Sequence, residues 1–174
     1  MLRIAHSLRE LPFPALMAVY REENQILGKR RWPWETPQRQ LALAEEDFRD
    51  YLQSIFFPQE GALYALWEQD GMLLSALRLE PYRDGLLLEA LATAPRERRK
   101  GYASALIQAV SQGLSSRGRV RLYAHVARNN TASLRTHARC GFRKIRDSAV
   151  YIDGSADSRC VTLLLDLPSS APRF

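Results

Sequence analysis

Apolar residues in the first third of the chain recur every three or four positions, which is the period of an amphipathic helix. One helix is predicted from Phe13, Leu16, Met17, Tyr20 and Leu27, with Asn24 on the same face. A second is predicted from Leu41, Ala44, Phe48, Tyr51, Leu52 and Ile55. Residues 26–37 contain Gly28, Pro33 and Pro37, so a loop is expected between the two helices. A short first strand is expected at residues 3–7.

Beyond the second helix, short apolar runs separated by turn residues indicate β-strands. Three strands are predicted in succession, at residues 62–67, 72–79 and 86–93. The first two are separated by Gln69-Asp-Gly71, a sequence typical of a hairpin turn. Residues 81–85 supply the next turn.

The remaining segments alternate between helix and strand. One helical face is formed by Ala103, Leu106, Ile107, Val110 and Leu114, and this helix is expected to end by Gly118. A half-buried strand is predicted at residues 119–126, and a helix at residues 130–139 with Gly141 as its stop. Two final strands are predicted at residues 142–152 and 159–167.

The predicted order is therefore β-α-α-β-β-β-α-β-α-β-β. Antiparallel hairpins on either side of one βαβ crossover indicate an α+β fold, with a mixed, mostly antiparallel sheet of about seven strands and helices on both faces. At 174 residues the chain is expected to form one domain over residues 1–174. Neither G-x-G-x-x-G nor G-x-x-x-x-G-K-[ST] occurs, which removes the main support for a dinucleotide or P-loop site.

Charge is distributed unevenly along the chain. Residues 1–95 carry ten basic and fourteen acidic side chains, and residues 96–174 carry fifteen and five. The basic half suits a phosphorylated cofactor or a nucleic acid, and the acidic half suits a cationic substrate. Two cysteines without histidines at ligand spacing make a metal site or disulfide framework unexpected. With no leader or membrane-spanning run predicted, a cytoplasmic protein without a membrane partner is expected.

The strand at residues 86–93 runs through a basic turn into a helix start. Free backbone N–H groups and the positive end of the helix dipole suit a pyrophosphate there. Gly101 permits close backbone approach, and Arg98, Arg99 and Lys100 can neutralise phosphate charge.

Two motifs in this region identify a family. Arg98-x-x-Gly101-x-Ala103 resembles the Arg/Gln-x-x-Gly-x-Gly/Ala acyl-CoA signature of GNAT-type N-acetyltransferases. Residues 130–142 resemble the family pattern Asn-x-x-Ala/Ser-x-x-hydrophobic-Tyr/His followed by Gly-Phe, with Thr136 where an apolar residue is usual. Both motifs occur in the family's order with a strand between them, and the resemblance covers residues 86–142.

The resemblance implies that two splayed strands hold acetyl-CoA as cosubstrate. Backbone groups of Leu91 and Thr93 would bind its acetyl and pantetheine parts, and an N–H near Leu91 would stabilise the oxyanion. Asn130 would contact the pantetheine arm. The full set of implied cofactor-binding residues is Leu91, Ala92, Thr93, Arg98, Arg99, Lys100, Gly101, Tyr102, Ala103, Ser104, Asn130 and Ser133. The amine would attack directly in a ternary complex, which needs no metal.

Two residues are candidates for proton transfer. Glu89 lies in an otherwise apolar strand, where burial raises a carboxyl pKa toward the strength of a useful base. The alternative is an ion pair with an arginine at the sheet surface, and Glu80 and Glu23 are further candidates. His137 occupies the family's Tyr position, where the resemblance implies an acid for the leaving thiolate; a partly buried structural role is the alternative.

The acceptor is less defined by the sequence. Tyr20, Trp32 and Trp34 would form a hydrophobic lid over it, unless they pack against the helices. With Glu23 and Glu80 they complete the candidate acceptor residues. The expected function is acetyl transfer to a primary amine of a small molecule or peptide, by a monomer or homodimer. A noncatalytic acyl-CoA-sensing module is the alternative, and a nucleic-acid-binding domain ranks last because no recognition element accompanies the arginines.

Overall fold

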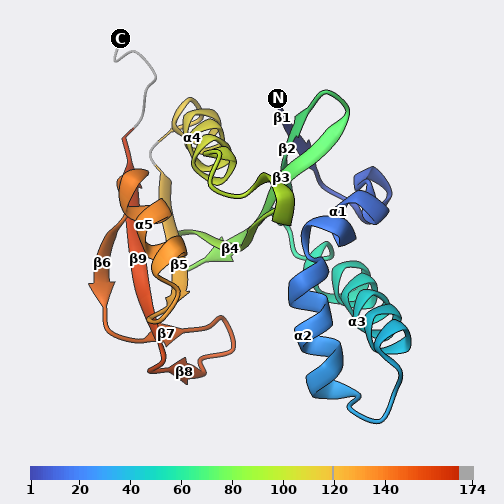
Figure 1. The fold of residues 1–174 in the computed structure, drawn as a ribbon. Coiled ribbons are helices and arrows are strands. Elements are labelled where there is room, and N and C mark those ends of the chain that lie inside the picture. The colour runs from blue at the N-terminus through green and yellow to red at the C-terminus, as the bar shows by residue number, and fades with distance from the viewer. Residues whose placement is uncertain (119, 169–174) are drawn as a thin grey trace.

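A computed structural model describes residues 1–118 and 120–168. Within these residues, seven strands form one sheet in the order β1-β2-β3-β4-β5-β9-β6 (Figure 1). The strands are β1 (Leu2–Ala5), β2 (Leu63–Gln69), β3 (Met72–Tyr82), β4 (Gly85–Thr93), β5 (Val120–Ala127), β6 (Arg143–Arg146) and β9 (Cys160–Leu167). Only β4 and β5 are parallel neighbours within this sheet. The predicted mixed, mostly antiparallel sheet is confirmed.

Helices cover both faces of this sheet, as predicted. They are α1 (Phe13–Val19), α2 (Arg21–Arg31), α3 (Pro37–Tyr51), α4 (Tyr102–Ser115) and α5 (Thr131–Arg139). On one face, apolar side chains of α4 pack with those of β3, β4, β5 and β9; Leu106 and Leu122 are fully buried there. On the other face, Leu16 of α1 packs with Tyr64 and Leu66 of β2. Short 3₁₀ turns lie at Leu8–Glu10 and Pro95–Glu97, and a π turn at Leu52–Phe56 continues α3.

The prediction of one helix followed by a loop at residues 26–37 was wrong. The chain bends at Tyr20, which ends α1 and begins α2, and α2 then continues to Arg31. Gly28 is a packing residue: a Cβ there would lie 2.8 Å from the carbonyl carbon of Gln40 in α3. The Gln40 side chain donates hydrogen bonds to the carbonyl oxygens of Trp32, at 3.0 Å, and Glu35, at 2.9 Å, which hold the loop between α2 and α3.

The single strand predicted at residues 142–152 was also wrong. It is divided into β6 and β7 (Ala149–Val150), and β7 pairs with β8 (Ala156–Asp157) in a separate two-stranded sheet. The register of β6 against β9 shifts between Lys144 and Arg146, and all four residues of β6 are exposed. No buried apolar side chain in β6 therefore holds the chain in one continuous strand up to residue 152. Arg119, predicted to begin a strand, lies outside the described residues; β5 follows it.

Candidate active site

Strands β4 and β5 are hydrogen-bonded over only a short part of their length. Their parallel pairing joins residues 86–88 of β4 to residues 122–124 of β5. Beyond Leu88, β4 continues to Thr93 while its ribbon turns away from β5 (Figure 1). The splayed strands expected from the sequence are therefore present, and the last residues of β4 form one wall of the opening.

A β-bulge shapes that wall. The register between β3 and β4 shifts just after Glu89, which pairs with Arg78, and Ala90 adopts a φ of 51°. The hydroxyl of Tyr20 donates a hydrogen bond of 2.6 Å to the carbonyl oxygen of Ala90. Burial raises the pKa of Tyr20 well above its usual value, which keeps the phenol protonated as a donor. The side chain of Tyr20 thus fixes the backbone immediately before Leu91.

The turn from β4 to α4 has the backbone of an anion site. Arg99 and Gly101 both have positive φ, at 64° and 89°, and Gly101 is the residue before the first turn of α4. A Cβ on Gly101 would meet no described atom within 4 Å, so the space beside this residue is open. The first N–H groups of a helix lack partners within the helix. This geometry fits the pyrophosphate of an acyl-CoA.

The basic side chains of this turn are used in different ways. Arg98 pairs with Glu22 of α2 at 2.6 Å and with Glu23 at 3.7 Å, and its Nε donates to the carbonyl oxygen of Thr93 at 3.3 Å. Lys100 pairs with Glu97 at 2.9 Å. Arg98 therefore connects the turn to α2, although the sequence indicated only phosphate neutralisation.

Asn130 begins α5, and its side-chain oxygen accepts a hydrogen bond of 3.0 Å from the N–H of Ser133. One turn later, Nδ1 of His137 lies 2.8 Å from the carbonyl oxygen of Ser133. The His137 ring packs edge-on against Phe142, and its Nε2 is buried without a partner in the described part of the chain. Burial lowers the pKa of His137. Cofactor contact by Asn130 and Ser133 and the acid role of His137 stay predictions.

A cluster of charged residues lies on β3 and β4. Glu89 pairs with Arg78 at 2.7 Å, and less than one fifth of either side chain is exposed. The Arg78 guanidinium lies over the ring of Tyr51 at 4.8 Å. Buried Glu80 accepts a hydrogen bond of 3.2 Å from Gln59. Burial first, and then the neighbouring Glu89, raises the pKa of Glu80. The ion pair with an arginine that was the alternative role for Glu89 is therefore present, and the proposed base contacts the Arg78 guanidinium.

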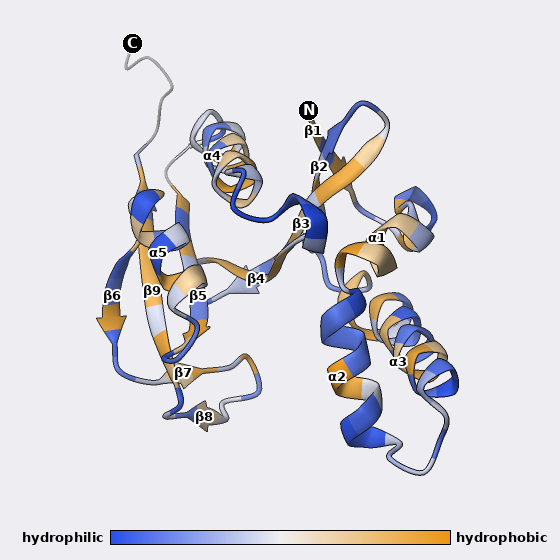
Figure 2. Cartoon of the chain, in the orientation of Figure 1, coloured by the Kyte–Doolittle hydropathy of each residue, from blue (hydrophilic) through white to orange (hydrophobic). Residues whose placement is uncertain are grey.

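A cavity of about 410 Å³ lies beside the bulge of β4. Its lining residues are Tyr20, Glu23, Asn24, Leu27, Phe48, Tyr51, Arg78, Ala90, Leu91 and Ala92. Among the predicted acceptor residues, Tyr20 and Glu23 are in this lining and Trp32, Trp34 and Glu80 are not; Trp34 is 74% exposed. Figure 2 shows α2, which borders the cavity, as mostly hydrophilic.

Sequence reasoning missed the cavity roles of Phe48, Tyr51 and Arg78. The helical spacing of Phe48 and Tyr51 indicated only a packed face. Arg78 was part of a strand with no other signal. In the described residues, no group of three or more His, Cys, Asp and Glu side chains could hold a metal ion. No described helix has the length and apolar character to cross a membrane.

Comparison with known families identifies the family of this chain. The sequence profile of the acetyltransferase (GNAT) family matches residues 14–142, most of the chain. The chain belongs to the GNAT acetyltransferase family. A search of curated protein sequences gives no match. The GNAT resemblance that the sequence motifs indicated is therefore confirmed.

Solved GNAT structures share the fold. The ribosomal-protein-S18-alanine N-acetyltransferase from Escherichia coli is 21% identical, with a TM-score of 0.59 and coverage of 100% of both chains. The PaiA N-acetyltransferase from Thermoplasma acidophilum, in complex with coenzyme A, is 15% identical with a TM-score of 0.60, covering 95% of this chain and 99% of that one. The spermidine N-acetyltransferase from Vibrio cholerae, in complex with CoA and spermine, is 15% identical with a TM-score of 0.60, covering 96% and 95%.

Proposed function

We propose that this protein transfers an acetyl group from acetyl-CoA to a primary amine by direct attack in a ternary complex. The observation that supports this most is the connection between two features. The open wall of β4 at Ala90–Ala92 also lines the cavity of about 410 Å³, so a thioester along β4 would face an amine in that cavity. Membership of the GNAT family and the CoA complexes of structural neighbours agree with this donor.

Each part of the site has a proposed task. The turn at Arg98–Ser104 would bind the pyrophosphate through backbone N–H groups at the start of α4. The N–H of Leu91 would stabilise the negative charge that develops on the carbonyl oxygen of the thioester. Tyr20 would support this step indirectly, because its hydroxyl holds the preceding carbonyl group of Ala90.

Glu89 is proposed as the general base. An alkylammonium must lose a proton before it can attack, and Glu89, which does not line the cavity but pairs with Arg78 that does, would accept that proton through a water molecule. Arg78 would hold the Glu89 side chain in a fixed orientation while the amine approaches. For His137, the proposed acid role requires the imidazolium form, because Nδ1 donates its proton to the Ser133 carbonyl oxygen and a second proton must be carried by Nε2, which has no partner in the described residues. Burial, which lowers the pKa of His137, disfavours that form.

The function is tested by measuring free thiol release from acetyl-CoA with a panel of primary amines. Turnover that requires the amine, together with mass spectrometry of the acetylated product, is the expected result. Binding of acetyl-CoA, seen as protection against thermal unfolding, without turnover of any amine would instead favour the noncatalytic sensing module.

The role of His137 is tested with His137→Ala. If this variant binds acetyl-CoA as the wild type does but turns over much more slowly, the acid role is supported. Weakened binding with normal turnover would assign His137 to packing.

A further inference from the structure

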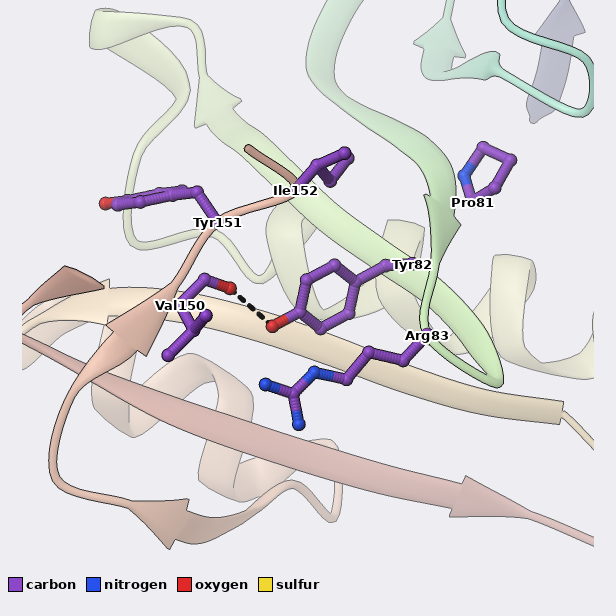
Figure 3. Close-up of a pocket in the computed structure, with 6 residues that line it drawn as sticks. All are labelled: Pro81, Tyr82, Arg83, Val150, Tyr151 and Ile152. Carbon is purple, nitrogen blue, oxygen red and sulfur yellow. Dashed lines mark hydrogen bonds between the residues drawn. The ribbon is translucent and has the colours of Figure 1, made fainter. Parts of the chain in front are cut away.

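A second, smaller cavity of about 180 Å³ lies at the far end of β3. It is lined by Pro81, Tyr82, Arg83, Val150, Tyr151 and Ile152, which come from the end of β3 and from β7 and the residues after it (Figure 3). The lining residues are two tyrosines, three apolar residues and one arginine. Neither the sequence motifs nor the proposed chemistry uses this cavity.

The wall that β7 contributes is tied to the main sheet. The carbonyl oxygen of Val150 accepts a hydrogen bond from the hydroxyl of Tyr82 (Figure 3) and lies 3.2 Å from Nε2 of His125 in β5. Nearby, the hydroxyl of Thr162 in β9 donates a hydrogen bond of 2.7 Å to the carbonyl oxygen of Ser148. Strands β3, β5 and β9 therefore all hold the segment around β7, so the cavity is formed before any ligand binds.

Arg83 is the charged group of this cavity. It occupies the tight turn between β3 and β4 with a φ of 52°, and its guanidinium lies over the Tyr82 ring at 5.2 Å. The carboxylate of the next residue, Asp84, accepts a hydrogen bond of 2.6 Å from the hydroxyl of Tyr123 and forms an ion pair with Arg121. Among the described residues no carboxylate lies within ion-pair distance of Arg83. The exposed guanidinium can therefore bind an anion from outside the chain.

This cavity lies on the same face of the sheet as the proposed base. Side chains alternate along β3, and the unbroken register from Arg78 to Tyr82 places Arg78, Glu80 and Tyr82 on one face together with Glu89 of β4. Four residues of extended strand span about 13 Å between the Arg78–Glu89 pair and Tyr82. One face thus has the Arg78–Glu89 pair at one end and the Tyr82 ring, over which the Arg83 guanidinium lies, at the other.

We propose that Arg83 and the cavity beneath β7 form a second acceptor subsite, which binds a carboxylate located at the opposite end of the acceptor from its amine. This inference rests on the proposed acetyl transfer and specifies its substrate class. The acceptor is then an extended amino acid or a short peptide with a free C-terminus. Tyr82 and Tyr151 would cover the carbon chain next to the carboxylate, and Arg83 would bind the carboxylate itself.

The experiment uses probes that differ only in the distal charge. Triglycine is compared with triglycinamide, and linear ω-amino acids of increasing length are compared with n-alkylamines of the same length. Acetyl transfer and calorimetric binding to the CoA-saturated protein are measured for the wild type, Arg83→Gln and Arg117→Gln. Arg117 follows α4 and lines neither cavity, so its variant is the matched control.

The expected result is that the wild type prefers the carboxylate-bearing probes, with an optimum at intermediate length. Arg83→Gln should lower kcat/KM and affinity for these probes at least tenfold, as expected for loss of a charge-assisted hydrogen bond, and leave the uncharged probes unchanged. Equal effects on both kinds of probe, or no preference in the wild type, would overturn the subsite while acetyl transfer stands. If no amine is acetylated, acetyl transfer itself fails, and the calorimetric comparison still decides whether Arg83 binds carboxylates.

Discussion

The proposed donor side and the proposed acceptor side of this site are built in different ways. On the donor side, Leu91 and Gly101 offer backbone groups within one continuous strand, turn and helix start. On the acceptor side, the contacts join segments far apart in the sequence, such as the Tyr20 hydroxyl with the Ala90 carbonyl oxygen. A backbone turn of this kind restricts the residue types at a few neighbouring positions, and this restriction is visible as a sequence motif. An acceptor cavity made of side chains from α2, α3 and β3 can change without disturbing that motif.

Removing the proposed base tests the acceptor side most strongly. Glu89→Gln should lower turnover about 100-fold at neutral pH, a typical contribution of a general base, and leave acetyl-CoA affinity unchanged. Turnover and acetyl-CoA binding are measured across pH. The matched control is Glu68→Gln, since Glu68 also pairs with an arginine, Arg3 at 3.2 Å, but lines neither cavity. Wild-type turnover of Glu89→Gln at every pH would remove the base role.

The helix pair next to the acceptor cavity depends on one glycine. Gly28→Ala should destabilise the protein by about 2 kcal/mol, because the new methyl group overlaps the backbone of Gln40 and forces α2 and α3 apart. Denaturant unfolding measures this cost. Gly113→Ala in α4 is the control: its methyl group would meet no described atom within 4 Å, so it should stabilise the protein by about 0.5–1 kcal/mol. Equal stability of Gly28→Ala and the wild type would contradict the close packing.

The same difference explains what the sequence could predict. Periodicity was sufficient for the sheet and the helices on both faces, because each depends on local pattern, and the splayed strands were expected only through the family resemblance of the two motifs. Gly28 was interpreted as a loop residue, since the sequence does not reveal that Gln40 packs against it. Trp32 and Trp34 were expected at the acceptor because they are aromatic and lie between helices. The cavity instead uses Phe48 and Tyr51, whose spacing is also that of an ordinary packed face.

On the donor side, Gly101→Ala should weaken acetyl-CoA binding about tenfold. The variant fills the open space beside the start of α4 and disfavours the positive φ there. With no described atom within 4 Å, the loss of stability should stay near 1 kcal/mol. Calorimetric titration with acetyl-CoA and denaturant unfolding separate these effects. Unchanged affinity would show that the turn does not hold the donor.

The smallest expected effect concerns buried charge on the acceptor side. Burial, and then Glu89, raises the pKa of Glu80, so the folded protein keeps this proton at pH values where the unfolded chain has lost it. In that window the folded state binds more protons, and stability falls as pH rises from the unfolded pKa, near 4.3, through the raised folded pKa. Glu80→Gln has no such proton to lose, and its side-chain oxygen can still accept the hydrogen bond from Gln59.

The stability of Glu80→Gln relative to wild type should therefore increase with pH across this window and then stay level. Urea unfolding of both proteins at a series of pH values measures it, with exposed Glu60→Gln as the matched control. A constant or decreasing difference would mean that Glu80 keeps its charge at no cost to the fold. Burial of Glu80 would then carry no electrostatic cost, and the two sides of the site would differ only in how far apart their contacting residues lie in the sequence.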